Sequence, residues 1–179
     1  KAIADVSGIV YADSGLDVEK LLNWVAQSGG VADYPNAEPI TNDELFALDV
    51  DVLIPAALHA QITAENVESI HAPIIVEAAN GPITADAAAV LDHGGVHVIP
   101  DILANAGGVV VSYYEWVQNK TSNRWTAHDV DIRLRDQIWD ACDRVSAQRS
   151  ARGCSRRAAA YIEASELLQT VYSLRGIFP

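Results

Sequence analysis

The sequence contains no methionine among its 179 residues and begins with Lys1. Because a translated chain begins with methionine, we expect it to be part of a longer polypeptide whose front is missing. No apolar run approaches the ~20 residues that a membrane-spanning helix needs, so we expect no membrane partner. No charged and then apolar leader is present either, which gives no indication of secretion and favours a cytoplasmic location.

Cationic side chains are scarce in the first part of the chain. Residues 1–101 hold 16 acidic side chains against only Lys1 and Lys20, a net charge of −14 within a chain whose total is −12. An acidic surface repels phosphate backbones, so we expect no nucleic-acid partner. The arginines between positions 144 and 157 are spaced as on solvated helix faces, where they form pairs with acids one turn away.

Metal-ligating residues are few and do not cluster. Cys142 and Cys154 form no CxxC motif, and the five histidines show no ligand spacing such as HExxH. We therefore expect reduced thiols, no disulfide and no metal site.

The chain does contain a regular alternation of short β-rich runs and helical segments. Strands are predicted at the end of residues 1–5 and at 50–54, 74–77 and 96–99. Helices are predicted after Asp17, Asn42, Thr63 and Thr84, which are suitable N-cap residues. Strands that alternate with helices predict an α/β fold, specifically a Rossmann-like, doubly wound and mostly parallel sheet. The first strand and glycine-rich loop of such a fold are not in this chain.

The pattern changes after Asp101, where long helices are predicted at roughly 102–119, 128–149 and 155–174. We predict that residues 1–119 form part of a dinucleotide-binding domain. Residues 120–179 are then helices that pack back on the sheet and on a missing N-terminal domain. The aromatic residues expected to make this packing are Trp116, Trp125, Trp139, Tyr161 and Tyr172.

Ligands of open α/β sheets bind at the carboxyl ends of the strands, where Asp5 and Asn80 lie. An acid in the position of Asp5 accepts hydrogen bonds from adenosine ribose hydroxyls, although a turn-capping role would suit the same residue. Asn80 lies in an Asn-Gly-Pro turn, where its amide offers a donor and an acceptor to a ligand. A turn without a ligand is the alternative.

Asn105 follows the last predicted strand and precedes Gly107 and Gly108, a run with poor helix propensity. Such a run suits a backbone that approaches a ligand, and a plain junction between loop and helix is the alternative. Ser112 lies one helical turn further on. Its hydroxyl could face the same pocket or bond to the carbonyl four residues earlier.

Four segments together resemble the coenzyme-binding half of the glutamate dehydrogenase family. They are Pro-Ala-Ala-Leu at 55–58, Glu-Ala-Ala-Asn-Gly-Pro at 77–82, the long run 100–119, and the tail that starts with Arg-Ala-Ala-Ala-Tyr at 157–161 and ends at 175–179. The resemblance covers nearly the whole chain. The Ser-Tyr-Tyr-Glu-Trp run at 112–116 favours glutamate dehydrogenase over the related leucine, phenylalanine and valine dehydrogenases.

The resemblance implies oxidative deamination of L-glutamate to 2-oxoglutarate and ammonia, with hydride passing to NAD or NADP. It also implies a homo-oligomer, a hexamer, at full length. The coenzyme positions that it implies are the adenosine ribose at Asp5, the lining residues Ala56, Ala57 and Leu58, the nicotinamide ribose at Asn80, and the nicotinamide end at Asn105. Val109 and Ser112 fall where the family contacts the glutamate side chain. The family's catalytic residues belong to an N-terminal domain, so none is expected here, and the fragment alone is expected to bind dinucleotide weakly and turn over nothing.

The choice of coenzyme and two alternatives stay open. Asp5 favours NAD because its charge repels a 2′-phosphate, but residues 6–8 could still hold that phosphate. One alternative function is a non-catalytic nucleotide-binding or regulatory module. The other is a related branched-chain or aromatic amino-acid dehydrogenase.

Overall fold

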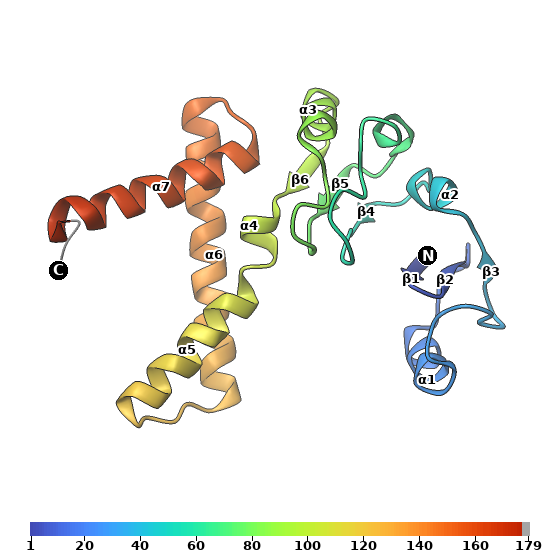
Figure 1. Cartoon of the computed structure of the whole chain (residues 1–179), viewed down its shortest axis with the longest axis horizontal. Helices are drawn as coiled ribbons and strands as arrows, with labels where there is room; N and C mark the ends of the chain where they lie inside the picture. Colours follow the sequence, from blue (N-terminus) through green and yellow to red (C-terminus); the bar gives the residue numbers. More distant parts are fainter. Residues whose placement is uncertain (177–179) are drawn as a thin grey trace. The chain divides into compact units, whose positions relative to one another are not determined.

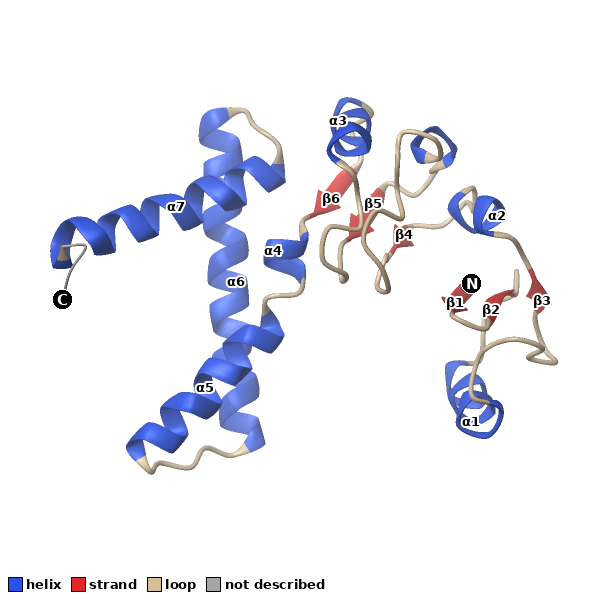
Figure 2. Cartoon of the chain, viewed as in Figure 1, coloured by secondary structure: helices blue, strands red, loops and turns tan. Residues whose placement is uncertain are grey.

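The computed structural model describes residues 1–176, which form a mixed α/β arrangement of helices and short strands (Figures 1 and 2). The chain divides into two compact units. The first contains Lys1–Leu53, Ala60–Ile74 and Ile83–Val96. The second contains Ile54–His59, Ile75–Pro82 and the chain from His97 onward.

The first unit begins with an antiparallel sheet of β1 (Ala2–Asp5), β2 (Gly8–Tyr11) and β3 (Glu38–Pro39), in that order. Asp5 pairs with Gly8, which leaves Val6 and Ser7 as a two-residue hairpin loop. The strand predicted to end at Asp5 is therefore confirmed. It is not followed directly by a helix, since β2 comes between, and neither β2 nor β3 was predicted from the sequence.

Helix α1 (Val18–Ser28) has the limits that its capping residues predict. The Asp17 side chain accepts a hydrogen bond from the Lys20 N–H, which satisfies one of the free donors of the first turn. Gly29 ends the helix at φ 84°, in the left-handed region that favours glycine. The helix buries Leu21 in a small core whose other buried members are Val10, Val31 and Tyr34.

Two predicted helix starts in the first unit are wrong. Helix α2 (Asn42–Phe46) is capped by Thr41 and not by Asn42, because Thr41 forms a reciprocal capping box with Glu44. The helix predicted after Thr63 is only a 3₁₀ turn, η1 (Val67–Ser69). The Asn66 side chain accepts from the Thr63 N–H at 2.8 Å, and this local bond competes with a regular helix. Helix α3 (Ala85–His93) follows Thr84 as predicted.

The second sheet confirms the predicted α/β class. It has three parallel strands in the order β4 (Val52–Leu53), β5 (Ile74–Val76) and β6 (His97–Ile99), each shorter than predicted. Backbone bonds join the segments that leave these strands. The Pro55 carbonyl accepts from the N–H groups of Ala78 and Ala79 at 3.1 and 2.9 Å, and the Glu77 N–H donates to the Ile99 carbonyl at 3.1 Å.

The second unit continues with helices α4 (Asp101–Ala104), α5 (Gly107–Thr121), α6 (Ala127–Arg152) and α7 (Arg156–Arg175). The helix predicted at 102–119 is thus two helices with a break at Asn105 and Ala106. The buried residues Leu103, Val145, Ala159 and Ala160 form the core that joins α4, α6 and α7. None of the helices within residues 1–176 is long and apolar enough to cross a bilayer. The end of the motif-bearing tail, residues 177–179, lies outside the described residues.

One of the five aromatic residues is half-buried, but the side chains that cover it belong to α5 and α6 and not to the sheet or a further domain. Trp125 is half-buried and meets Tyr114 edge-on, with ring centroids 5.6 Å apart. The other four side chains are more than half exposed in this structure: Trp116, Trp139, Tyr161 and Tyr172. Packing of these four against a further domain, like the domain boundary at 119, stays a prediction.

Candidate functional site

The segment after β4 offers an uncharged exposed surface in the second unit. Ala56, Ala57 and Leu58 are all exposed, and 63% of Leu58 is accessible. The preceding residue, Pro55, is joined through its carbonyl to Ala78 and Ala79. The three predicted lining residues therefore come directly after a residue that is hydrogen-bonded to the turn after β5.

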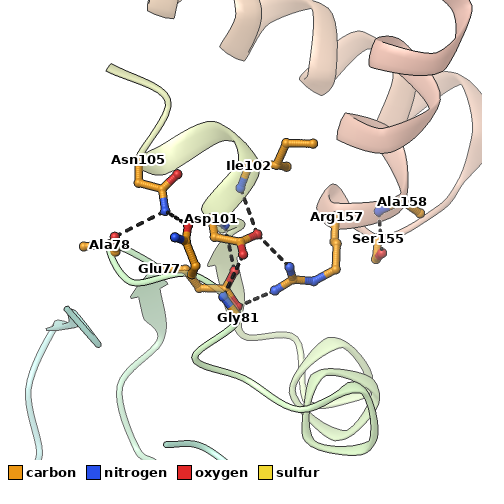
Figure 3. Close-up of polar contacts among 10 residues, drawn as sticks. Glu77, Ala78, Gly81, Asp101, Ile102, Asn105, Ser155, Arg157 and Ala158 are labelled. Carbon is orange, nitrogen blue, oxygen red and sulfur yellow. Dashed lines mark hydrogen bonds and ion pairs between the residues drawn. The ribbon is translucent and has the colours of Figure 1, made fainter. Parts of the chain in front are cut away.

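The two predicted asparagines meet at the ends of β5 and β6. Asn105 Nδ2 donates to Asn80 Oδ1 at 2.8 Å and to the Ala78 carbonyl at 3.3 Å (Figure 3). Asn105 is the C-cap residue of α4, so this pair joins the turn after β5 to the break between α4 and α5. Among the described residues, the pair leaves the Asn80 amino group and the Asn105 carbonyl oxygen free to bond to a ligand.

A charged cluster that the sequence did not predict lies next to this pair. Glu77 is fully buried, with one carboxylate oxygen paired to Arg157 Nη2 and the other accepting from the Asp101 N–H at 2.7 Å. Asp101 Oδ1 accepts from Arg157 Nη1 at 3.0 Å, and Oδ2 accepts from the Gly81 N–H at 2.8 Å (Figure 3). A buried carboxylate needs such a charged partner, because leaving it alone in an apolar interior costs several kcal/mol.

The charges of the cluster stabilise one another. Burial raises the pKa of Asp101, but the N–H groups of Gly81 and Ile102 and the charge of Arg157 outweigh it, so the net shift is downward. Burial lowers the pKa of Arg157, but its bonds to Glu77 and Asp101 outweigh it, so the net shift is upward. Both groups are therefore fully charged at neutral pH.

One sequence signal could have indicated the cluster. Glu77 ends an otherwise apolar Ile-Ile-Val run, and an acid in a buried strand requires a cation nearby. The sequence offers nine arginines, however, and Arg157 lies 80 positions further along the chain. Only the fold identifies the partner.

Asp5, in the first unit, has the turn-capping role that was one of its two interpretations. Its Oδ1 accepts from the Ser7 N–H at 2.7 Å and from the Ser7 hydroxyl, and its Oδ2 accepts from the Val31 N–H at 3.0 Å. The hydroxyl bond is the largest of the effects that lower the pKa of Asp5. A carboxylate has about four acceptor positions, so an exposed Asp5 can still accept from a ribose hydroxyl. That second role stays a prediction.

Val109 and Ser112 lie on the exposed surface of α5. Val109 is 75% accessible, which suits contact with a ligand. The Ser112 hydroxyl donates to the Gly108 carbonyl at 2.9 Å, the bond expected for a serine without a ligand. Its two lone pairs can accept further bonds, but that bond uses its proton, so contact with a carboxylate requires the hydroxyl to rotate.

Residues 1–176 contain no group of three or more histidine, cysteine, aspartate or glutamate side chains that could hold a metal ion. Cys142 and Cys154 are free thiols that pack against the core of the second unit. Burial is the main cause that raises the pKa of the Cys142 thiol, which makes it less reactive at neutral pH.

Comparison with known proteins gives consistent matches along the chain. The family model described as Glutamate/Leucine/Phenylalanine/Valine dehydrogenase matches residues 1–176. Glutamate dehydrogenase A2 of Halobacterium salinarum is 45% identical over 179 residues, which cover 99% of this chain and 43% of that protein. Glutamate dehydrogenase of Thermotoga maritima is 44% identical, with 99% and 43% covered. The chain therefore spans less than half the length of these relatives.

Solved structures match the fold. The hetero-hexameric glutamate dehydrogenase from Thermus thermophilus, in its Leu-bound form, superposes with a TM-score of 0.90 at 30% identity, covering 99% of this chain and 42% of that one. Glutamate dehydrogenase from Peptoniphilus asaccharolyticus superposes with a TM-score of 0.80 at 31% identity, with 99% and 40% covered.

Proposed function

The chain belongs to the glutamate/leucine/phenylalanine/valine dehydrogenase family, and we propose that it is the coenzyme-binding part of an NAD(P)-dependent glutamate dehydrogenase. The reaction is oxidative deamination of L-glutamate to 2-oxoglutarate and ammonia. The observation that supports this best is the Asn80–Asn105 pair, which lies where two parallel strands end and offers one free donor and one free acceptor.

The residues present fit a dinucleotide. The exposed segment 56–58 can contact the coenzyme without a charge, while the amides of Asn80 and Asn105 can bond to the nicotinamide ribose and the nicotinamide end. When bound, the coenzyme supplies the hydride acceptor, and the protein contributes position and polarity. In the first unit, the Asp5 carboxylate is held by Ser7 and Val31 in a fixed orientation that suits the adenosine ribose.

The glutamate side chain is proposed to contact Val109 and Ser112 on α5. Val109 offers an exposed apolar surface, and Ser112 lies three residues further on the same helix, close to one turn away. Rotation of the Ser112 hydroxyl away from Gly108 would let it donate to the γ-carboxylate. In this proposal, residues 1–119 are part of a dinucleotide-binding domain, and residues 120–179 are helices that pack on it. The groups that transfer protons belong to residues outside this chain.

The proposal favours NAD over NADP, because the Asp5 charge repels a 2′-phosphate. A relative that is 42% identical, from Halobacterium salinarum, is named an NADP-specific glutamate dehydrogenase A1, so both coenzymes occur in this family. Comparison of kcat/KM with the two coenzymes decides between them. An Asp5→Asn variant should improve NADP relative to NAD.

The proposed reaction is tested by following nicotinamide reduction by the full-length protein with glutamate as substrate. We expect Asn105→Ala to lower kcat/KM by about tenfold, because loss of an amide that bonds to the coenzyme costs roughly 1.5 kcal/mol. Asn23→Ala, at an exposed position of α1, is the matched control and should leave the rate unchanged. Failure of the full-length protein to reduce either coenzyme would support the non-catalytic module, and a preference for leucine over glutamate would support a related dehydrogenase.

The proposed enzyme is a cytoplasmic homo-oligomer, with the hexamer as its expected form. The exposed aromatic residues of α5, α6 and α7 are available for burial against further protein. The Thermus thermophilus neighbour is described as a hetero-hexamer. Light scattering of the full-length protein measures the assembly directly, and a monomer would contradict it.

A further inference from the structure

We propose that Arg157 is a positioning residue for the coenzyme site, because one guanidinium fixes both of the loops that carry Asn80 and Asn105. The inference rests on the proposed function, since it is the coenzyme whose contacts these loops would make. Arg157 itself touches neither asparagine in the contacts of the structure and would act only through two carboxylates.

Arg157 lies in the first turn of α7. Its side chain is 29% exposed, against 0% for Glu77 and 18% for Asp101. It therefore closes the cluster from the side of α7, with one guanidinium nitrogen on each carboxylate (Figure 3).

The two carboxylates that Arg157 binds are in turn bonded to the backbone of the loops that carry the asparagines. Asp101 Oδ2 accepts from the N–H of Gly81, the residue directly after Asn80, at 2.8 Å. Glu77 Oε2 accepts from the N–H of Asp101 at 2.7 Å and so holds the first turn of α4, which ends at Asn105. With both anchors in place, the two asparagines meet at 2.8 Å.

The geometry at this position suits a guanidinium better than an ammonium. A guanidinium is planar and presents parallel N–H groups, so it can bond to two carboxylates at the same time in a fixed geometry. A lysine ammonium at this position would keep the charge, but it would lack the two parallel N–H donors that bind two carboxylates at once. The positioning role therefore predicts that Arg157→Lys is not a conservative change.

The test uses the full-length protein with three variants. Arg157→Lys and Arg157→Met remove the planar pair of donors. Arg144→Met is the matched control, because Arg144 also binds two carboxylates, Asp140 on its own helix α6 and Glu163 on α7, and lies outside the cluster. Titration with reduced dinucleotide gives Kd, and steady-state rates give KM and kcat. We expect both Arg157 variants to raise Kd and coenzyme KM on the order of tenfold, since small displacements of positioning groups have large effects. Arg144→Met should leave both constants unchanged.

The outcomes separate the two ideas. Wild-type protein that binds no dinucleotide would refute the proposed function and, with it, this inference. Wild-type binding together with unchanged Kd and KM in Arg157→Lys would overturn the role of Arg157 alone, and so would a fall in kcat at constant KM, which reports fewer folded molecules. Asp101→Asn, which keeps the shape of one partner but not its charge, provides a second measurement if the Arg157 variants fail to fold. Asp101→Asn should also raise Kd, and an unchanged Kd would overturn the inference.

Discussion

Asp101 connects three parts of the second unit through a single carboxylate, which accepts from Gly81, Ile102 and Arg157. Because these donors bind the charged form, the pKa of Asp101 lies below its ordinary value of 3.8. A group whose pKa is lowered on folding stabilises the folded state above its unfolded pKa. That contribution is lost as the pH falls through the folded pKa.

We therefore predict a pH-dependent effect for Asp101→Asn. At neutral pH the variant should be less stable than wild type by about 1.5–3 kcal/mol, the usual value of hydrogen bonds to a charged group. The difference in free energy of unfolding should shrink below about pH 4, as the wild-type carboxylate is protonated. Urea unfolding across this range measures it, with the exposed Asp136→Asn as a control that should show little difference at any pH. A difference that stays constant into acid would contradict the assignment.

Gly30 illustrates a steric requirement at the scale of one atom. A Cβ built on Gly30 would lie 2.3 Å from the Ser7 hydroxyl oxygen and 2.6 Å from its Cβ. That hydroxyl has little freedom to move, because it bonds to Asp5 and accepts from the Ala32 N–H at 3.0 Å.

Gly30→Ala should consequently destabilise the chain by about 1–3 kcal/mol, the typical cost of overpacking. Gly108→Ala is the control for stability, since Gly108 is helical and a Cβ there meets nothing within 4 Å. It should be neutral or stabilising by up to about 1 kcal/mol. Chemical unfolding of the two variants gives the comparison, and equal stabilities would show that the loop after α1 adapts more easily than its hydrogen bonds indicate.

The sequence named individual candidate site residues but not the contacts between them. Asn80 and Asn105 were identified separately, because each follows a strand, and the structure brings them to 2.8 Å. The partnership of Glu77 with Arg157 was missed because it depends on how α7 packs in the second unit, and local spacing carries no information on that. The same holds for Asp5. The sequence left its role open between a turn cap and a ribose contact, and its bond to the Val31 N–H depends on the fold.

Among the elements, two of the four helix starts predicted from capping residues are correct. Helices α1 and α3 begin where Asp17 and Thr84 place them, and α6 and α7 agree with the predicted ranges within a few residues. Short strands without strong alternation, such as β3, gave no signal, and two residues are too few for one. At η1 the sequence signal was misleading. Thr63 is a good N-cap residue, but the Asn66 side chain bonds to the Thr63 N–H, and only a 3₁₀ turn forms.

Two threonine caps in this chain allow a matched test. Thr126 starts α6 with a full capping box, in which its hydroxyl accepts from the Asp129 N–H at 3.1 Å and Asp129 bonds back to Thr126. Thr84 holds the equivalent position at α3 but makes no side-chain cap bond. Thr126→Ala should cost about 1 kcal/mol and Thr84→Ala distinctly less. Thermal or urea unfolding compares the two, and a larger loss in Thr84→Ala would mean that the hydroxyl bond is not what stabilises the start of α6.

At the scale of the whole chain, the net charge of −12 is concentrated in the acidic residues of the first 101 positions. Four of the ten cations in the later part form ion pairs in the described structure, for example Arg135 with Asp131 and Arg152 with Glu166. Exposed pairs of this kind contribute at most about 1 kcal/mol each, and salt weakens them. The acidic residues of the first part have few such partners. Their mutual repulsion destabilises the folded chain, and salt weakens that repulsion as well.

Salt should therefore stabilise this chain, because screening of the net repulsion outweighs the loss of a few exposed ion pairs. Between about 0.01 M and 1 M KCl the Debye length falls from roughly 30 Å to 3 Å, which removes repulsion between all but adjacent carboxylates. The measurement is Tm across that range at neutral pH, where it should rise. The control is the same series near pH 4.6, the isoelectric point of the sequence, where the net repulsion is gone and the rise should largely disappear. An equal rise at both pH values would indicate a general salt effect on apolar burial, and a fall at neutral pH would mean that the helix ion pairs dominate.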